Sequence, residues 1–180
     1  MAAGANILIV IDMQNDFISG ALGTPEAQAI VANAVERVRA WGGEVIYTLD
    51  THGDDYAATQ EGRRLPVPHC IKGTDGWRVP AELQTALDER GAVAYEKGSF
   101  GSPQLAQDLA ARNEQEPIGG ITLIGICTDI CVVSNALLLK AFLPEVPVTV
   151  DASLCAGVTP AAHEAALATM ASCQVEVIGA

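Results

Sequence analysis

Apolar positions along this chain alternate between two spacings, which predicts strands and helices in turn. Consecutive apolar residues are typical of strands buried on both faces, whereas apolar residues three or four apart indicate amphipathic helices. Pro or Ser-Pro pairs precede several of the helical stretches, and Gly42-Gly43 ends the first of them. We expect strands at 6–11, 44–49, 92–95, 118–124, 146–150 and 175–178, and helices at 25–41, 80–90, 103–113, 131–143 and 160–171.

Strand and helix alternate over the whole chain, and this order predicts the fold class. It favours an α/β protein with three layers, α/β/α, around a six-stranded and mostly parallel sheet of the doubly wound, Rossmann-like kind. The length of 180 residues fits one domain, which we place at 1–180. The segment 51–78 has no such periodicity, and loops this long in a compact domain are usually functional.

Composition and charge narrow the classes of partner. The hydrophobic fraction is 49% against 18% charged residues, which disfavours disorder. A net charge of −12 argues against nucleic acid and against an anionic membrane surface. No apolar run is long enough for a membrane span, and 6–11 is too short and too strand-like for a signal peptide. We therefore expect a cytoplasmic protein.

Cysteine and glycine patterns exclude several other classes. The five cysteines form no CxxC pair, so free thiols are expected instead of a disulfide framework or a zinc ribbon. No G-x-G-x-x-G follows the first strand and no phosphate-binding loop is present, which disfavours a dinucleotide-binding domain.

Cys131 is the candidate nucleophile. It follows the expected strand 118–124 after a tight turn and opens the expected helix 131–143. The positive end of a helix dipole favours the thiolate, which is the reactive form of cysteine. The carboxyl ends of strands are also where open α/β sheets bind ligands. The competing interpretation is a buried structural thiol.

Asp12 and Lys97 also follow expected strands, the first and the third. Because parallel strands end at one edge of the sheet, both side chains can converge on Cys131. Lys97 would then lower the pKa of Cys131, Asp12 would act as general base and acid, and Cys131 would be the nucleophile for acyl transfer. Taken singly, Lys97 fits a solvated surface lysine and Asp12 a turn cap.

A second cluster combines Asp50, His52 and His69. Asp50 and His52 are two apart at a strand end and so share a face, and His69 returns from the far end of the long loop. One carboxylate and two imidazoles suit zinc, iron or manganese with positions left open for water or substrate. The alternative is that both histidines are ordinary loop residues.

Several ordered motifs give the chain a family resemblance. It resembles the isochorismatase-like cysteine hydrolases and, within them, the nicotinamidase-like members, over nearly its whole length. The matching motifs are VIDMQNDF at 10–17, DTH at 50–52, PHCIKGT at 68–74, Lys97 with Phe100, and GICTDICV at 125–132.

The resemblance implies a catalytic triad at Asp12, Lys97 and Cys131. It also implies a non-proline cis peptide between Ile126 and Cys127, which would aim the N–H groups of Cys127 and Cys131 at one point as an oxyanion hole. The implied activity is hydrolysis of a small carboxamide such as nicotinamide, through a thioester, to the acid and ammonia.

The resemblance also assigns the metal and the pocket. Asp50, His52 and His69 would hold a divalent metal, zinc first and iron or manganese otherwise, and Glu61 stands where a further ligand falls in some members. Phe17, Phe100 and Ile126 are expected in the substrate pocket. Relatives often assemble, so a homo-oligomer is implied. We interpret His163 as a helix-surface or packing residue, because no partner is placed with it in the sequence.

Two departures from the family pattern concern substrate choice. The segments 53–56 and 98–102 differ from those of many nicotinamidases, and the second is rich in small residues. Hydrolysis of another small amide or ureide, or an isochorismatase-type vinyl ether hydrolysis, is therefore an alternative. The intact Asp–Lys–Cys set favours C–N cleavage, and a catalytically silent scaffold of the same fold is the second alternative.

Overall fold

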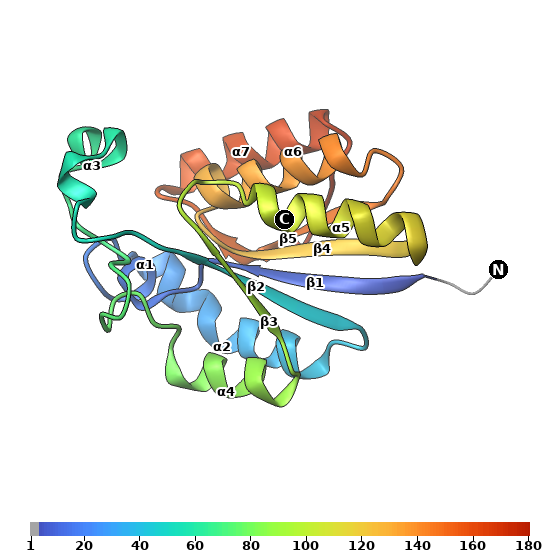
Figure 1. Cartoon of the computed structure of the whole chain (residues 1–180), viewed down its shortest axis with the longest axis horizontal. Helices are drawn as coiled ribbons and strands as arrows, with labels where there is room; N and C mark the ends of the chain where they lie inside the picture. The colour runs from blue at the N-terminus through green and yellow to red at the C-terminus, as the bar shows by residue number, and fades with distance from the viewer. Residues whose placement is uncertain (1–3) are drawn as a thin grey trace.

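The computed structural model describes residues 4–180 and places one six-stranded sheet at their centre (Figure 1). The strand order is β3-β2-β1-β4-β5-β6, and every neighbouring pair in this part of the chain is parallel. The expected six-stranded, mostly parallel sheet is thus confirmed. The strands are β1 (Ala5–Ile11), β2 (Glu44–Asp50), β3 (Val93–Lys97), β4 (Ile118–Ile126), β5 (Val148–Ala156) and β6 (Glu176–Ile178).

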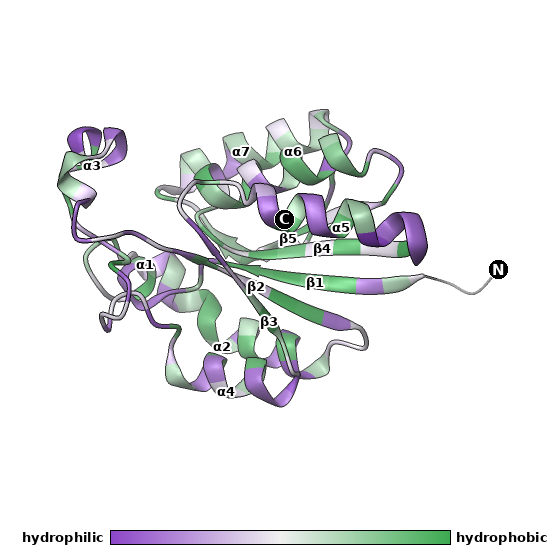
Figure 2. Ribbon diagram, viewed as in Figure 1, coloured by the Kyte–Doolittle hydropathy of each residue, from purple (hydrophilic) through white to green (hydrophobic). Residues whose placement is uncertain are grey.

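Helices cover both faces of the sheet, which confirms the three-layer prediction (Figure 1). One face carries α5 (Pro103–Gln115), α6 (Val133–Phe142) and α7 (Pro160–Ser172), and the other carries α2 (Pro25–Ala40) and α4 (Ala81–Glu89). The central strand β1 serves both layers, because Ile7 and Ile9 pack on the first face and Leu8 and Val10 on the second. Figure 2 shows β1 and β4 as hydrophobic over most of their length.

Three helices, α2, α5 and α7, begin at the residues predicted from the sequence. Thr24, Ser102 and Thr159 each accept a hydrogen bond from the backbone N–H three residues later, and a proline follows each of them. A hydroxyl N-cap followed by proline satisfies a free N–H and presets the first helical φ angle.

The neighbours β1 and β4 form the switch point of the sheet, since the chain leaves β1 toward β2 and leaves β4 toward β5. Ile11 pairs with Gly125 at their carboxyl ends. Gly125 has φ 124°, and a Cβ atom there would lie 2.1 Å from the carbonyl oxygen of Ile11. Only glycine permits so close an approach. A crevice for ligands is expected at this edge of a doubly wound sheet.

Three segments differ from the sequence-based expectation. The helix expected to open at Cys131 begins earlier, because a π-helical segment η2 (Thr128–Val132) precedes α6. Strand β5 continues to Ala156 instead of ending at 150, since Cys155 and Ala156 still pair with the end of β4. The long loop contains two short helices, η1 (Tyr56–Ala58) and α3 (Gln60–Arg64), and α3 lies at the edge of the molecule in Figure 1.

The remaining helix is short: α1 (Asn15–Ile18) follows β1 directly. Within residues 4–180, no helix has both the length and the apolar character required to cross a membrane.

Candidate active site

Asp12, Lys97 and Cys131 meet at the carboxyl edge of the sheet. Asp12 follows β1, Lys97 is the last residue of β3, and Cys131 lies in η2 after β4. The Lys97 Nζ atom is 2.6 Å from Asp12 Oδ2 and 3.6 Å from Cys131 Sγ. All three side chains are buried. The structure therefore brings together the three residues that the sequence singled out.

Thr48 fixes the Asp12 carboxylate from the side opposite Lys97. The Thr48 hydroxyl donates to Asp12 Oδ1 at 2.6 Å, and the Asp12 N–H donates to Thr48 Oγ1 at 3.2 Å. In the described part of the chain no hydrogen-bond donor is aligned with Oδ2, whose ion-pair partner is Lys97. Thr48 was not predicted from the sequence, although it precedes Asp50 by two residues in β2 and so lies on the same face of the strand.

Burial and mutual charge interactions shift the pKa values of Lys97, Asp12 and Cys131. Burial opposes a charged lysine, but the anions around it raise the pKa of Lys97 above its ordinary value, Asp12 most strongly. Burial raises the pKa of Asp12, and Lys97 offsets part of that rise. Burial and the Asp12 carboxylate raise the pKa of Cys131 well above its ordinary value, and Lys97 compensates only in part. Lys97 thus acts on the pKa of Cys131 in the expected direction, but its effect does not outweigh those of burial and of Asp12.

The turn before Cys131 contains the non-proline cis peptide that the resemblance implied. The peptide between Ile126 and Cys127 is cis. Cys127 is the N-cap of η2, and its carbonyl accepts hydrogen bonds from the N–H groups of Ile130 and Val132. Cys131 thus lies in the first turn of a helical segment, although not at its first residue. Both Cys127 and Cys131 line the same pocket.

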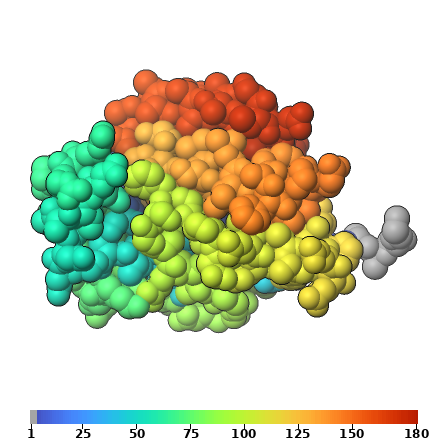
Figure 3. Space-filling model, turned by 45° about the horizontal axis from the view of Figure 1, so that its top comes forward, coloured from blue at the N-terminus to red at the C-terminus, as the bar shows by residue number. Residues whose placement is uncertain are grey.

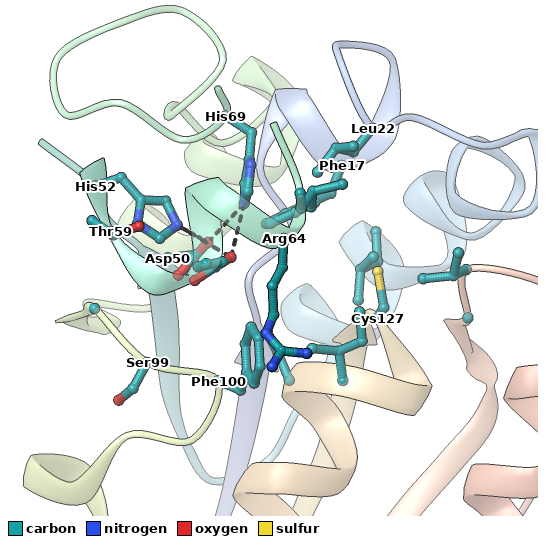
Figure 4. A pocket seen from close by; sticks show the side chains of 18 of the residues that line it. Phe17, Leu22, Asp50, His52, Thr59, Arg64, His69, Ser99, Phe100 and Cys127 are labelled. Carbon is teal, nitrogen blue, oxygen red and sulfur yellow. Dashed lines mark hydrogen bonds and ion pairs between the residues drawn. The ribbon is translucent and has the colours of Figure 1, made fainter. Parts of the chain in front are cut away.

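Asp50, His52 and His69 form a second cluster beside the first. One donor atom from each lies within 4.8 Å of the others. The His52 Nε2 and His69 Nε2 atoms are 3.0 Å and 3.6 Å from Asp50 Oδ2, and Glu61 Oε1 is 3.8 Å and 3.6 Å from the same nitrogens (Figure 4). Two imidazoles and two carboxylates that converge in this way fit a divalent metal.

We call Asp50, His52, His69 and Glu61 the metal-type cluster. Two contacts hold it in place. The Gln14 amide donates to the carbonyl of Asp50 at 2.9 Å and accepts from the Asp50 N–H at 2.8 Å. The His69 Nδ1 atom is 2.9 Å from the carbonyl of Val67, which leaves Nε2 directed at Asp50. Nothing in the sequence pointed to Gln14, because its partner Asp50 lies 36 residues away at the end of β2.

A single cavity of about 730 Å³ joins the two clusters. Asp50, His52, His69 and Cys131 line it, and so do Phe17, Phe100 and Ile126, the three residues expected there. Figure 3 shows the surface hollowed between the segment that carries α3 and the segment that follows β3.

Arg64 is a lining residue that the sequence analysis did not single out. It comes from the end of α3 and extends toward Phe100 in Figure 4. A charged residue in a loop is usually a solvated one, so the sequence held no signal for it.

His163 was interpreted as a helix-surface or packing residue, and the structure gives it a partner. Its Nδ1 atom lies 2.8 Å from Thr128 Oγ1, in the residue that follows Cys127. The neighbouring Asp129 accepts a hydrogen bond from the N–H of Val158. The turn around Cys131 is therefore tied to the start of α7 and to the connection before it.

The fold and the cluster define a class, the α/β proteins that gather an acid, a lysine and a cysteine at the switch point of a parallel sheet. The model of one family, described as the isochorismatase domain, matches residues 6–180. The chain therefore belongs to the isochorismatase family, and the resemblance seen in its motifs is confirmed.

Individual relatives agree with this assignment. A nicotinamidase/pyrazinamidase of Mycobacterium tuberculosis is 30% identical over 95% of this chain and 97% of its own. The crystal structure of a Bacillus subtilis nicotinamidase has a TM-score of 0.80, 29% identity, and coverage of 96% of this chain and 98% of its own. An N-carbamoylsarcosine amidase from Thermoplasma acidophilum has a TM-score of 0.70 and 28% identity, and covers 96% and 95%.

Proposed function

We propose that residues 1–180 form one domain that is a cysteine-dependent amidohydrolase acting on a small carboxamide such as nicotinamide. The observation that carries the proposal is the buried set of Asp12, Lys97 and Cys131, of which Cys131 lines a mostly apolar pocket. The similarity to two nicotinamidases over nearly the whole chain supports the choice of substrate.

Proton transfer from Cys131 to Asp12 starts the reaction. The proposed reaction starts from a negative Asp12, a positive Lys97 and a neutral Cys131 thiol. Moving one proton from the thiol to Asp12 gives a thiolate beside Lys97 without changing the net charge of the buried set. The raised pKa of Asp12 favours this transfer, because it makes the carboxylate a stronger base.

The thiolate then forms a C–S bond with the amide carbon, and the electron pair of the C=O bond moves to oxygen. The N–H groups of Cys127 and Cys131 stabilise that oxyanion. When the C–N bond breaks, Asp12 returns its proton to the nitrogen and ammonia leaves. A water molecule, deprotonated by Asp12, attacks the thioester, and the acid and the Cys131 thiol are released.

Asp50, His52 and His69 would hold a divalent metal, with Glu61 as a further ligand. Zinc is our first choice, and iron or manganese suits the same donors. When bound, such a metal supplies a Lewis-acid site for a ring nitrogen of the substrate. Phe17 and Phe100 border the same cavity and would hold the ring between the metal site and Cys131.

Hydrolysis of a ureide is the second candidate. The similarity to an N-carbamoylsarcosine amidase favours it. So does the cavity, which falls within the range of pockets that hold ligands larger than a single aromatic ring.

Release of ammonia from nicotinamide, pyrazinamide, aliphatic amides and ureides tests the proposal. We expect the pyridine-type amides to be hydrolysed, and Cys131→Ala to abolish the activity. Cys173→Ser is the matched control, because Cys173 is an exposed free thiol. No release from any amide or ureide, or full activity of Cys131→Ala, would refute the proposal and favour a scaffold.

We also propose that the protein works in the cytoplasm as a homo-oligomer. All five cysteines are free within the described residues, which suits a reducing compartment. Val93, on the edge strand β3, is an exposed apolar side chain that a second copy would cover. Light scattering after size exclusion measures the assembly, and a monomer at micromolar concentration would contradict it.

A further inference from the structure

Asn135 is a buried amide on α6, one helical turn after Cys131. Its side chain is 1% exposed and connects two segments of the pocket. The Nδ2 atom donates to the carbonyl of Cys131 at 2.8 Å and to the carbonyl of Phe100 at 3.1 Å. The Oδ1 atom accepts from the N–H of Ser102 at 2.9 Å. The amide thus uses both of its donor hydrogens and its acceptor on backbone groups.

This pattern suits an amide and no other side chain of similar size. Two carbonyls need donors and one N–H needs an acceptor, and only the amide of asparagine offers both at this reach. An aspartate would bring its charge against two carbonyls, and a leucine would leave three backbone groups without a partner in the interior. Sequence gave no signal for Asn135, because two of its three partners lie on a segment 33 and 35 residues away.

The segment that Asn135 holds is the loop 98–102, which carries Phe100. Lys97 precedes it and is fixed by the ion pair with Asp12. Ser102 ends it and caps α5. Gly101 lies against α6, where an added Cβ atom would be 3.3 Å from Ser134 O. The Phe100 side chain is 47% exposed, so packing restrains it little and its position depends on the backbone of this loop.

We propose that Asn135 is a positioning residue that fixes Phe100, a wall of the substrate pocket, relative to the nucleophile Cys131. The proposal rests on the amidohydrolase function, in which Phe100 contacts the substrate ring. The Asn135 side chain holds the backbone carbonyls of Cys131 and Phe100 at a fixed distance from each other. Asn135 therefore determines how well an aromatic amide is held in line with Cys131.

Asn135→Ser should keep the hydrogen bond to Cys131 and remove those to Phe100 and Ser102. A serine on a helix can donate to the carbonyl four residues earlier, which is that of Cys131, but it cannot reach Phe100 or Ser102. In Asn135→Ser we expect kcat/KM for nicotinamide to fall on the order of tenfold, mainly through KM, because the ring loses a fixed wall. For small aliphatic amides kcat/KM should change less. Asn135→Thr fills more volume and replaces Asn135→Ser if the latter is unstable.

A double-mutant cycle with Phe100→Ala distinguishes positioning from general destabilisation. If Asn135 acts through Phe100, the double variant is no worse than Phe100→Ala alone. Additive losses would overturn the proposal. Asn113→Ser is the matched control: its side chain accepts a hydrogen bond from the N–H of Ile118, at the other end of β4. It should alter stability without altering the preference for aromatic amides.

Hydrogen exchange tests the same contact without a substrate. In Asn135→Ser the amide of Ser102 should exchange faster, while amides in the middle of β4 keep their protection. Unchanged exchange at Ser102 would refute the structural part of the proposal. A wild-type protein that hydrolyses no amide refutes the proposed function instead, so the two failures are distinct.

Discussion

Lys97 Nζ lies 2.6 Å from Asp12 Oδ2 where both side chains are almost fully buried. An ion pair in such a place is held by its geometry, since removing either partner leaves an uncompensated charge. Besides burial, which raises it most, the pair acts on the pKa of the Cys131 thiol: Asp12 raises it and Lys97 lowers it. Neutralising Asp12 should therefore change reactivity and catalysis in opposite directions.

Asp12→Asn tests this directly. Without the carboxylate, the effect of Lys97 is unopposed and the pKa of Cys131 falls, so alkylation by iodoacetamide should become half-maximal at a lower pH. Amide hydrolysis should fall by about 10²–10⁴, because the general base is lost. Mass spectrometry follows the alkylation in a Cys173→Ser background, which removes the exposed thiol. Half-maximal alkylation at a higher pH than in the wild type would contradict the conclusion that Asp12 raises the pKa of Cys131.

Thr48→Val removes the hydroxyl that donates to Asp12 Oδ1. This bond favours the carboxylate and lowers the pKa of Asp12, so its loss raises that pKa further. Because the proposed general base must be ionised in the free enzyme, the acidic limb of the kcat/KM profile should move to higher pH, so that the loss of activity grows as the pH falls. Thr48→Ser keeps the hydroxyl and should restore the profile. An acidic limb that stays in place would exclude this role of Thr48.

Strand ends were the part of the site that the sequence could predict. Asp12 and Lys97 come at the ends of parallel strands that finish at one edge of the sheet, and Cys131 follows β4, the neighbour of β1. The contacts that orient these residues could not be predicted in the same way. Thr48, Asn135 and the partner of His163 become visible only when distant segments pack together. The π-helical turn at Thr128–Val132 likewise arises where the end of β4 meets α6 and α7, and local propensity carries no mark of it.

Glu61→Gln tests the fourth member of the metal-type cluster. Its carboxylate lies close to both histidines, so we expect zinc affinity to fall by about 10–100-fold. Titration calorimetry measures this with metal alone and needs no substrate. Asp54→Asn is the control, because Asp54 is exposed in the same loop. Equal affinities for the wild type and Glu61→Gln would remove Glu61 from the ligand set.

Gly125→Ala tests the close approach of β1 and β4. The residue has φ 124°, and the new methyl group would meet the carbonyl of Ile11. We expect unfolding free energy to fall by at least about 2 kcal/mol, measured by urea denaturation. Gly42→Ala is the control, since a Cβ atom there meets nothing within 4 Å. It should change stability by less than about 0.5 kcal/mol. Similar losses of unfolding free energy in the two variants would show that the close approach of β1 and β4 at Gly125 does not require glycine.

The hydrogen bond between Thr128 and His163 supports the turn in which we propose the oxyanion site. Thr128 is fully buried and directly follows Cys127, and His163 holds it from the first turn of α7. Gly157 allows this packing, because an added Cβ atom would lie 2.9 Å from both His163 Cβ and Asp129 Oδ1. A shift of this turn would move the N–H of Cys127 away from the developing oxyanion, which weakens transition-state binding more than substrate binding.

Thr128→Val and His163→Leu should therefore each lower kcat about tenfold with little change in KM. Because both remove the same bond, the double variant should resemble either single variant, whereas independent roles would give additive losses. Thr128→Ser keeps the hydroxyl and should keep most of the activity. Glu164→Gln, an exposed change beside His163, is the control for the helix. Losses confined to KM would show that the contact shapes the pocket and leaves the oxyanion site unaffected.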